Sequence, residues 1–245
     1  MLLGLLAGGG CTEKTTAVPD AGRDYYPVAV GNYWVYAVRD TTWSRADINN
    51  QRSMPRDSSF QFRESITETY TDAAGKSVFR LQRAKRRNAA AAWVNDSAFS
   101  ITLLPNALVL NRANTRTVEL IYPPREGRSW NLNAFNDNFN DTILAETRHF
   151  QAVGKPYVTG ASAGLPAASY ANTITTENTG AAAEVSAVRL LGYRQVYAKG
   201  IGPVFRRRVN LVYFSYASGN QQITPPGAYT SAFVRRETLI DYHVQ

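Results

Sequence analysis

The stretch FQFRESITETY, residues 60–70, decides the fold class because its side chains alternate between two faces with the period of a β-strand. One face carries Phe60, Phe62, Glu64, Ile66, Glu68 and Tyr70, and the other carries Gln61, Arg63, Ser65, Thr67 and Thr69. The sequence DAAGK at 72–76 follows, and its glycine favours a tight turn. Residues 78–86, whose apolar side chains become fewer toward the basic end, then return as the partner strand, so the two segments are predicted to form an antiparallel β-hairpin.

The same pattern extends over most of the chain. Further strands are predicted at residues 33–43, 93–104, 107–111, 116–122, 141–153, 168–176, 185–198, 204–217 and 229–244. The polar segment 47–59, which contains Pro55, is predicted as a long loop, and residues 89–92 and 180–184 are long enough for one helical turn at most. We therefore expect a mainly β protein. It should be a single domain of antiparallel strands that form a curved sheet or open half-barrel, with little helix.

A frame of four residues occurs twice along the chain. It consists of Tyr26, Pro27, Gly31 and Trp34 in the first copy and of Tyr122, Pro123, Gly127 and Trp130 in the second. The proline fixes φ, the glycine permits a tight turn, and the tryptophan is expected to fill the core where the next strand begins. Two interpretations stay open: the domain at 25–245 has two related halves, 25–121 and 122–245, or four positions recur by chance.

The only cysteine, Cys11, follows a short apolar segment that ends in three glycines. Residues 1–10 are interpreted as a truncated lipoprotein signal, Cys11 as the site of lipid attachment, and residues 11–24 as a flexible tether. No charged residue precedes Cys11, and Gly8 stands where such signals usually carry an aliphatic residue. The alternative is an ordinary free cysteine. A membrane-spanning helix is excluded, because no run approaches the roughly 20 apolar residues that a bilayer needs.

Three phrases resemble those of secreted bacterial lipoproteins of the Bacteroidota type. They are YYPVAVGNYWVY at 25–36, the stretch 122–135 with EGRSW at 126–130 and NAF at 133–135, and YAKGIGPV at 197–204, which contains Gly200 and Gly202. The resemblance implies a β-rich, non-enzymatic protein of the cell envelope. It would be lipid-anchored to the outer membrane, on the periplasmic side or at the cell surface. It also implies an open half-barrel similar to those of lipoprotein carriers and lipid-binding periplasmic proteins, or a lipocalin-like one.

Residue types that carry catalysis or bind metals are sparse. The two histidines, His149 and His243, lie in predicted strands without a second ligand nearby in sequence. The segment NDNFND at 136–141 offers oxygen ligands but lacks the glycine and closing glutamate of an EF-hand, so we interpret it as a polar turn. Phosphate-binding loops, nucleophile elbows and zinc-protease motifs are missing from the sequence. We therefore predict no catalytic residue, no metal site and no cofactor.

The chain is basic, with a formal net charge of +8, and 22 of its 27 basic residues are arginine. Such a balance permits binding to nucleic acid, anionic lipid or acidic glycan, although most of the arginines are interpreted as solvated strand faces. Nucleic acid conflicts with a lipid anchor outside the cytoplasm. The first hypothesis is therefore a carrier of a lipid or other hydrophobic ligand. The alternative is a structural lipoprotein that binds an envelope protein or a glycan through an aromatic or basic surface, and a hydrolase ranks last.

Overall fold

The computed structural model describes residues 21–136, 146–161, 165–178, 186 and 188–245. Within these ranges the chain is almost entirely antiparallel strand, preceded by one 3-10 turn, η1 (Arg23–Tyr25). The strands are β1 (Tyr33–Trp43), β2 (Pro55–Thr71), β3 (Ser77–Arg86), β4 (Val94–Leu103), β5 (Ala107–Arg112), β6 (Thr115–Ile121), β7 (Ser129–Asn131), β8 (Thr147–Val158), β9 (Ser169–Asn178), β10 (Arg189–Ala198), β11 (Gly202–Tyr213), β12 (Tyr216–Ser218), β13 (Gln221–Ile223) and β14 (Tyr229–His243). The predicted mainly β, single-domain fold is confirmed.

Twelve of these strands form one sheet that is nearly closed into a barrel. Their order is β6-β5-β4-β3-β2-β1-β14-β11-β10-β9-β8-β7. The two edge strands meet at a seam, where the Val118 amide donates a hydrogen bond to the Leu132 carbonyl at 2.8 Å. The indole Nε1 of Trp130 donates to the Val118 carbonyl at 2.7 Å. Side-chain and backbone bonds together therefore cover the edges that an open sheet would expose.

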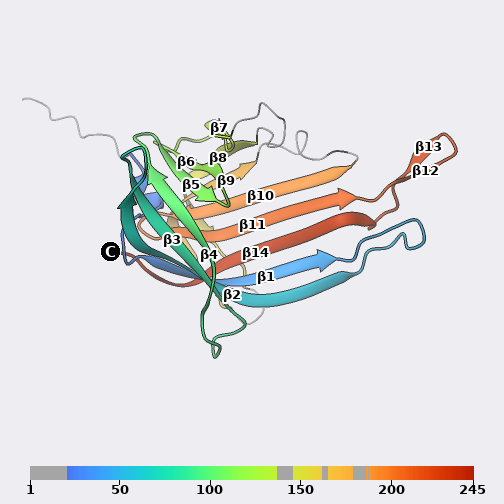
Figure 1. The fold of residues 1–245 in the computed structure, drawn as a ribbon, viewed down its shortest axis with the longest axis horizontal. Helices are drawn as coiled ribbons and strands as arrows, with labels where there is room; N and C mark the ends of the chain where they lie inside the picture. The colour runs from blue at the N-terminus through green and yellow to red at the C-terminus, as the bar shows by residue number, and fades with distance from the viewer. Residues whose placement is uncertain (1–20, 137–145, 162–164, 179–185, 187) are drawn as a thin grey trace, which may run out of the picture.

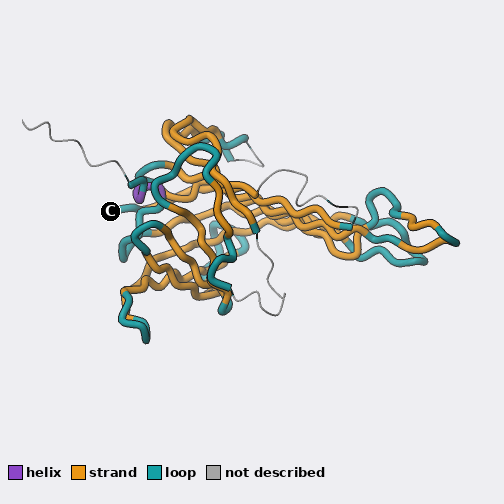
Figure 2. Tube along the Cα trace, turned by 90° about the horizontal axis from the view of Figure 1, so that it is seen from above, coloured by secondary structure: helices purple, strands orange, loops and turns teal. Residues whose placement is uncertain are grey.

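Part of the sheet extends beyond the barrel as an arm. In Figure 1 the neighbouring strands β2, β1, β14, β11 and β10 run to the right past the shorter strands, and the β12–β13 hairpin stands at the far end. Figure 2 shows the same extension from above as a narrow projection. The chain thus has a barrel at one end and a single layer of long strands at the other.

Each half of the chain contributes six strands to the twelve-stranded sheet. The first half supplies β1 to β6 in consecutive order, and the second supplies β7 to β11 together with β14. The first strand of each half follows one copy of the four-residue frame, and it lies next to the last strand of the other half. The predicted boundary at residues 121 and 122 coincides with the end of β6. A common origin of the two halves stays a prediction.

The barrel core is filled with large side chains. The fully buried hydrophobic ones are Trp34, Tyr36, Ile66, Leu81, Ile101, Leu108, Leu110, Leu120, Phe150, Ile174 and Tyr197. Trp34 fills the core at the start of β1, as its frame predicts, and its Nε1 donates to the Ile201 carbonyl at 2.6 Å. Gly202 lies against this indole with φ of 106°, and a Cβ added there would stand 2.9 Å from Nε1 of Trp34. A side chain at position 202 would therefore clash as well as strain the backbone.

Several predicted boundaries are wrong. The predicted loop 47–59 ends early, because β2 begins at Pro55 and residues 55–59 pair with β1. The pairing of β2 with β3 runs only from Gln61 to Thr71. No β3 residue therefore requires a backbone N–H from Pro55, which has none. The predicted strand 204–217 ends at Tyr213, since β12 pairs with β13 in a separate two-stranded sheet. The three-residue β7 was not predicted because it is too short for alternation to show.

Three further expectations need correction. A bulge after Ile66 breaks the alternation of residues 60–70 and leaves Glu68 and Tyr70 exposed. Residues 89–92 form a turn in place of a helical turn, because the Asn88 side-chain oxygen accepts the amides of the two residues at 90 and 91. Arg23, assigned to the tether, already belongs to the fold, since its Nη2 donates to the Pro105 carbonyl at 2.9 Å. The predicted helical turn at 180–184 and the predicted strand residues 141–145 lie outside the described residues.

Candidate functional site

The barrel interior contains an ionic network centred on Glu64, whose side chain is 1% exposed. One carboxylate oxygen of Glu64 accepts a hydrogen bond from Nη2 of Arg206 at 2.8 Å, and the other accepts from Nη2 of Arg83 at 3.2 Å. Nη1 of Arg206 also donates to Glu237 at 3.0 Å. Four charged side chains from four strands therefore neutralise one another where water has little access.

Strand alternation explains how these side chains reach the interior. On β2, Glu64 follows Phe60 and Phe62 at intervals of two residues, so all three point inward. Arg83 lies directly opposite Glu64 on β3, while Arg206 and Glu237 are directly opposite each other on β11 and β14. The barrel then brings these two pairs together across its interior.

The charge of the network is fixed by its geometry. Burial by itself raises the pKa of the Glu64 carboxyl, but the guanidinium groups of Arg206 and Arg83 outweigh that effect and hold the pKa at about 2. Burial likewise lowers the pKa of Arg206, but Glu64 and Glu237 raise it well above its usual value. The network therefore remains ionised at neutral pH.

A cavity of about 380 Å³, called here the inner cavity, borders this network between β3, β4 and β5 on one side and β10, β11 and β14 on the other. Its lining consists of Arg83, Ser97, Phe99, Arg112, Ala113, Tyr193, Gln195, Arg206, Arg207, Arg208, Arg235 and Glu237. Six of these twelve residues are arginines and one is a carboxylate. Its volume lies within the range of about 300–1,000 Å³ that is usual for small-molecule sites.

Aromatic rings support the arginines of the inner cavity. The Arg83 and Arg112 guanidinium carbons lie 4.7 Å and 5.0 Å from the centre of the Phe99 ring. Outside the lining, the Arg148 guanidinium lies over the ring of the lining residue Tyr193 at 3.3 Å from its centre and pairs with Glu146. Stacking on rings holds a guanidinium in place while it leaves its edge N–H groups available to donate.

Some of these donors have no acceptor. Among the described residues, Nε of Arg83, Arg112 and Arg206 is buried without a hydrogen-bond partner. Buried donors without acceptors are costly, so each is a position at which a ligand acceptor would be stabilised.

Arg208 lies at the mouth of the inner cavity and is exposed. It stands opposite Tyr193 on β10 and Arg235 on β14, and Arg235 already pairs with Asp40 through two hydrogen bonds of 2.8 and 2.7 Å. Within the part of the chain that the structure describes, no ion pair or hydrogen bond involves the Arg208 guanidinium. Arg208 is therefore a free cation at the entrance of an arginine-lined cavity.

Tyr193 adds a neutral polar group to the same wall. Its hydroxyl donates a hydrogen bond to the Gln195 side chain. Burial, and then the negative charge of Glu119, raises the pKa of Tyr193 to about 12. The hydroxyl is therefore protonated at neutral pH and adds no negative charge that would repel an anion.

The lining of the inner cavity includes none of the predicted motif residues. Tyr26, Trp34 and Tyr122 are buried in the core, and Trp130 closes the seam. The four motif glycines Gly31, Gly127, Gly200 and Gly202 all have positive φ, as expected for turns. The cis peptide bond between Tyr122 and Pro123 belongs to the second frame. These residues shape the barrel, whereas Cys11 lies outside the described residues.

The histidines are not brought together with other metal ligands. His149 has Nε2 at 3.8 Å from a Glu177 oxygen, and His243 stacks on Tyr33. No group of three or more His, Cys, Asp or Glu side chains suited to a metal occurs in the described ranges. Nor do those ranges contain a helix long and apolar enough to cross a bilayer.

Comparison of the chain with protein-family models, with curated proteins and with solved structures found no match. The interpretation of the site therefore depends on its own geometry. From the sequence, most of the arginines were expected to lie on solvated strand faces. Alternation within each strand could have separated Arg206 and Arg208 from Arg207, yet it could not have shown which strands face one another.

Proposed function

We propose that this chain is a non-enzymatic binding protein whose inner cavity holds an organic anion with an aromatic or aliphatic part. The observation that carries the proposal is Arg208, an exposed arginine without an ion pair among the described residues, at the mouth of a cavity lined by further arginines. An anion there would gain charge-assisted hydrogen bonds, which are about twice as strong as neutral ones.

The neutral part of the ligand is inferred from the rest of the lining. Phe99, Ala113 and the Tyr193 ring supply apolar surface beside the guanidinium groups. Because the network around Glu64 is already balanced, a ligand with one or two negative charges matches the cavity better than a highly charged one. An acidic amphiphile of moderate size satisfies both requirements. The sequence predicts a hydrophobic ligand, and the arginines of the lining favour one that also has an anionic head group.

Two fluorescent probes with the same ring system test this proposal. Anilinonaphthalene sulfonate carries a negative charge, whereas phenylnaphthylamine is neutral. We expect the sulfonate to bind the folded protein, and the change Arg208→Gln to weaken it about tenfold, as expected for loss of one charge-assisted hydrogen bond. The change Arg125→Gln removes an exposed arginine that does not line the cavity and should leave binding unchanged. Equal binding of both probes, unaffected by Arg208→Gln, would favour a purely apolar ligand.

We also propose that the protein is held in the cell envelope by lipid on Cys11, at the outer membrane. The support is the small-residue segment before a unique cysteine and the polar stretch that follows it. Metabolic labelling with a fatty acid should mark the wild-type chain and spare Cys11→Ala. Equal labelling of the two chains would contradict lipid attachment at Cys11, and it would have no bearing on the proposal for the inner cavity.

A further inference from the structure

Four arginines form a continuous row across four neighbouring strands on the outer face of the sheet. Arg39 on β1 lies opposite Arg236 on β14, Arg236 lies opposite Arg207 on β11, and Arg207 lies opposite Arg194 on β10. We call these four residues the arginine row. Directly opposed residues of antiparallel strands point to the same face, so the four side chains share one surface.

The rows on either side of it, which face the interior, are arranged differently. There Asp40 lies opposite Arg235, and Glu237 lies opposite Arg206, with hydrogen bonds between the partners in both cases. Like charges directly opposite each other destabilise a sheet. One interior row also contains a like-charged pair, Arg235 opposite Arg208, but there Asp40 neutralises Arg235. The arginine row has no carboxylate among its four members and places like charges opposite each other at three successive cross-strand positions.

The arginine row is accessible to a partner. All four of its residues are exposed. With strands spaced by about 4.8 Å, the row spans roughly 14 Å in a line across the sheet. At its β10 end it meets one carboxylate, Glu177, which lies opposite Arg194 and within 3.8 Å of His149. At the β1 end, Asp57 lines a pocket together with Arg39 and Arg236. The surface is therefore a line of positive charge with one carboxylate near each end.

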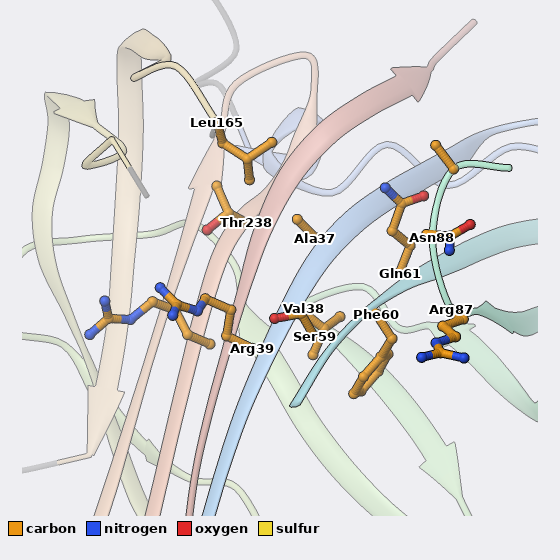
Figure 3. A pocket seen from close by; sticks show the side chains of 12 residues that line it. Ala37, Val38, Arg39, Ser59, Phe60, Gln61, Arg87, Asn88, Leu165 and Thr238 are labelled. Atoms are coloured by element: carbon orange, nitrogen blue, oxygen red, sulfur yellow. The ribbon is translucent and has the colours of Figure 1, made fainter. Parts of the chain in front are cut away.

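A hollow of about 240 Å³ adjoins the Arg39 and Arg236 end of the row. Figure 3 shows its side chains, with Leu165 pointing toward Thr238 and Ala37 from the opposite side. Ser59, Gln61 and Thr238 add neutral hydroxyl and amide groups to the same lining. Polar groups of this kind can form hydrogen bonds with the hydroxyls of a sugar, and the methyl groups of Leu165 and Ala37 can pack on its apolar faces.

The surroundings of the row argue against a flat membrane as the partner. Tyr157 of β8 packs on Phe205 of the same outer face, with ring centres 5.9 Å apart, and the charges of Arg194 and Arg236 act on its hydroxyl. Leu165 overhangs the hollow from the segment between β8 and β9. The arginine row thus lies beside raised side chains, where an extended chain can reach it more easily than a planar bilayer.

We infer that the arginine row binds an acidic glycan, a polysaccharide with a carboxylate or sulfate on successive sugars, whose chain runs across β1, β14, β11 and β10. The negative groups of the glycan pair with guanidiniums of the row and reduce the repulsion among them. A sugar ring at one end occupies the hollow beside Arg39. The inner cavity opens on the other face of the sheet, and Arg207 is the one member of the arginine row that also borders it.

The test measures binding of oligogalacturonate, which has one carboxylate per sugar, by calorimetry at several salt concentrations. We expect binding that weakens as salt is raised and that is absent for monomeric galacturonate at the same concentration of sugar. The double variant Arg194→Gln with Arg236→Gln, which alters no residue of the inner cavity lining, should weaken it at least tenfold. The control Arg56→Gln with Arg125→Gln removes the same charge from exposed positions outside the row and should change it less than twofold.

Three outcomes would overturn the inference. An equal loss of oligogalacturonate affinity in the row variant and in the control variant would mean that net charge alone attracts the glycan. Binding of monomeric galacturonate as tight as that of the oligomer would mean that the site recognises a single charge. The third outcome is binding to phosphatidylglycerol vesicles that the row variant loses, with no binding of oligogalacturonate to the wild type. It would mean that the row binds a membrane. The change Arg208→Gln should leave oligogalacturonate binding intact, so failure of the inner cavity proposal and failure of this one are distinguishable.

Discussion

The Glu64 carboxylate and the Arg206 guanidinium are separated by 142 positions in sequence and by 2.8 Å in the barrel interior. Each belongs to a different half of the chain, on β2 and β11. Their contact therefore forms only when the two six-stranded halves have joined through β1 and β14. The charges of Glu64 and Arg206 therefore neutralise each other only in the assembled barrel.

Glu64→Gln should destabilise the fold by about 3–5 kcal/mol, because it leaves Arg206 and Arg83 buried without their shared counter-charge. Chemical denaturation followed by circular dichroism measures the change. Glu68→Gln is the matched control on the same strand, since the Glu68–Arg80 pair is half exposed and is worth about 1 kcal/mol at most. Similar losses in the two variants would contradict the role assigned to the interior network.

Acid should destabilise the protein through the same carboxyl. The pKa of Glu64 is about 2 in the folded state and 4.5 by the ordinary value, so its stabilising effect is complete above pH 4.5 and disappears as pH falls toward 2. The difference corresponds to about 3 kcal/mol. Unfolding free energies of wild type and Glu64→Gln, measured from pH 6 down to pH 2, should converge as the pH falls. Parallel curves would contradict the assignment.

Gly202→Ala should be more harmful than Gly200→Ala. Both positions have positive φ, 106° and 73°, but only at Gly202 would the new Cβ meet a neighbour within 4 Å, the buried Trp34 indole. Backbone strain should cost about 1–2 kcal/mol at Gly200, and the clash should add to that at Gly202. Melting temperatures and tryptophan fluorescence would measure the difference, and equal losses would contradict the packing argument.

Trp130→Phe should loosen the seam between β6 and β7. It keeps a ring in the core but removes the donor to the Val118 carbonyl, at a cost of about 1–2 kcal/mol. Hydrogen exchange should become faster at β6 and β7, with little change at the β1–β14 junction. Trp93→Phe, outside the seam, serves as the control. Uniform loss of protection over the whole barrel would mean that the seam has no separate stability.

Part of this molecule follows from local sequence. Alternation at residues 60–70 predicts the strand and the inward face of Phe60, Phe62 and Ile66, because the side-chain period of a strand is two whatever it pairs with. The turn glycines are likewise predictable, since positive φ is a property of single residues. The bulge after Ile66 and the start of β2 at Pro55 are not, because they depend on the neighbouring strand.

The sequence by itself determined a mainly β chain with inward-facing aromatics, turn glycines and an excess of arginine. Only the tertiary structure decided which arginines oppose carboxylates and which oppose other arginines. Arg206 and Arg207 are adjacent in sequence, yet one is paired in the interior and the other lies in the arginine row. The physical reason is that cross-strand neighbours are set by sheet order and register, which bring together residues far apart in the chain.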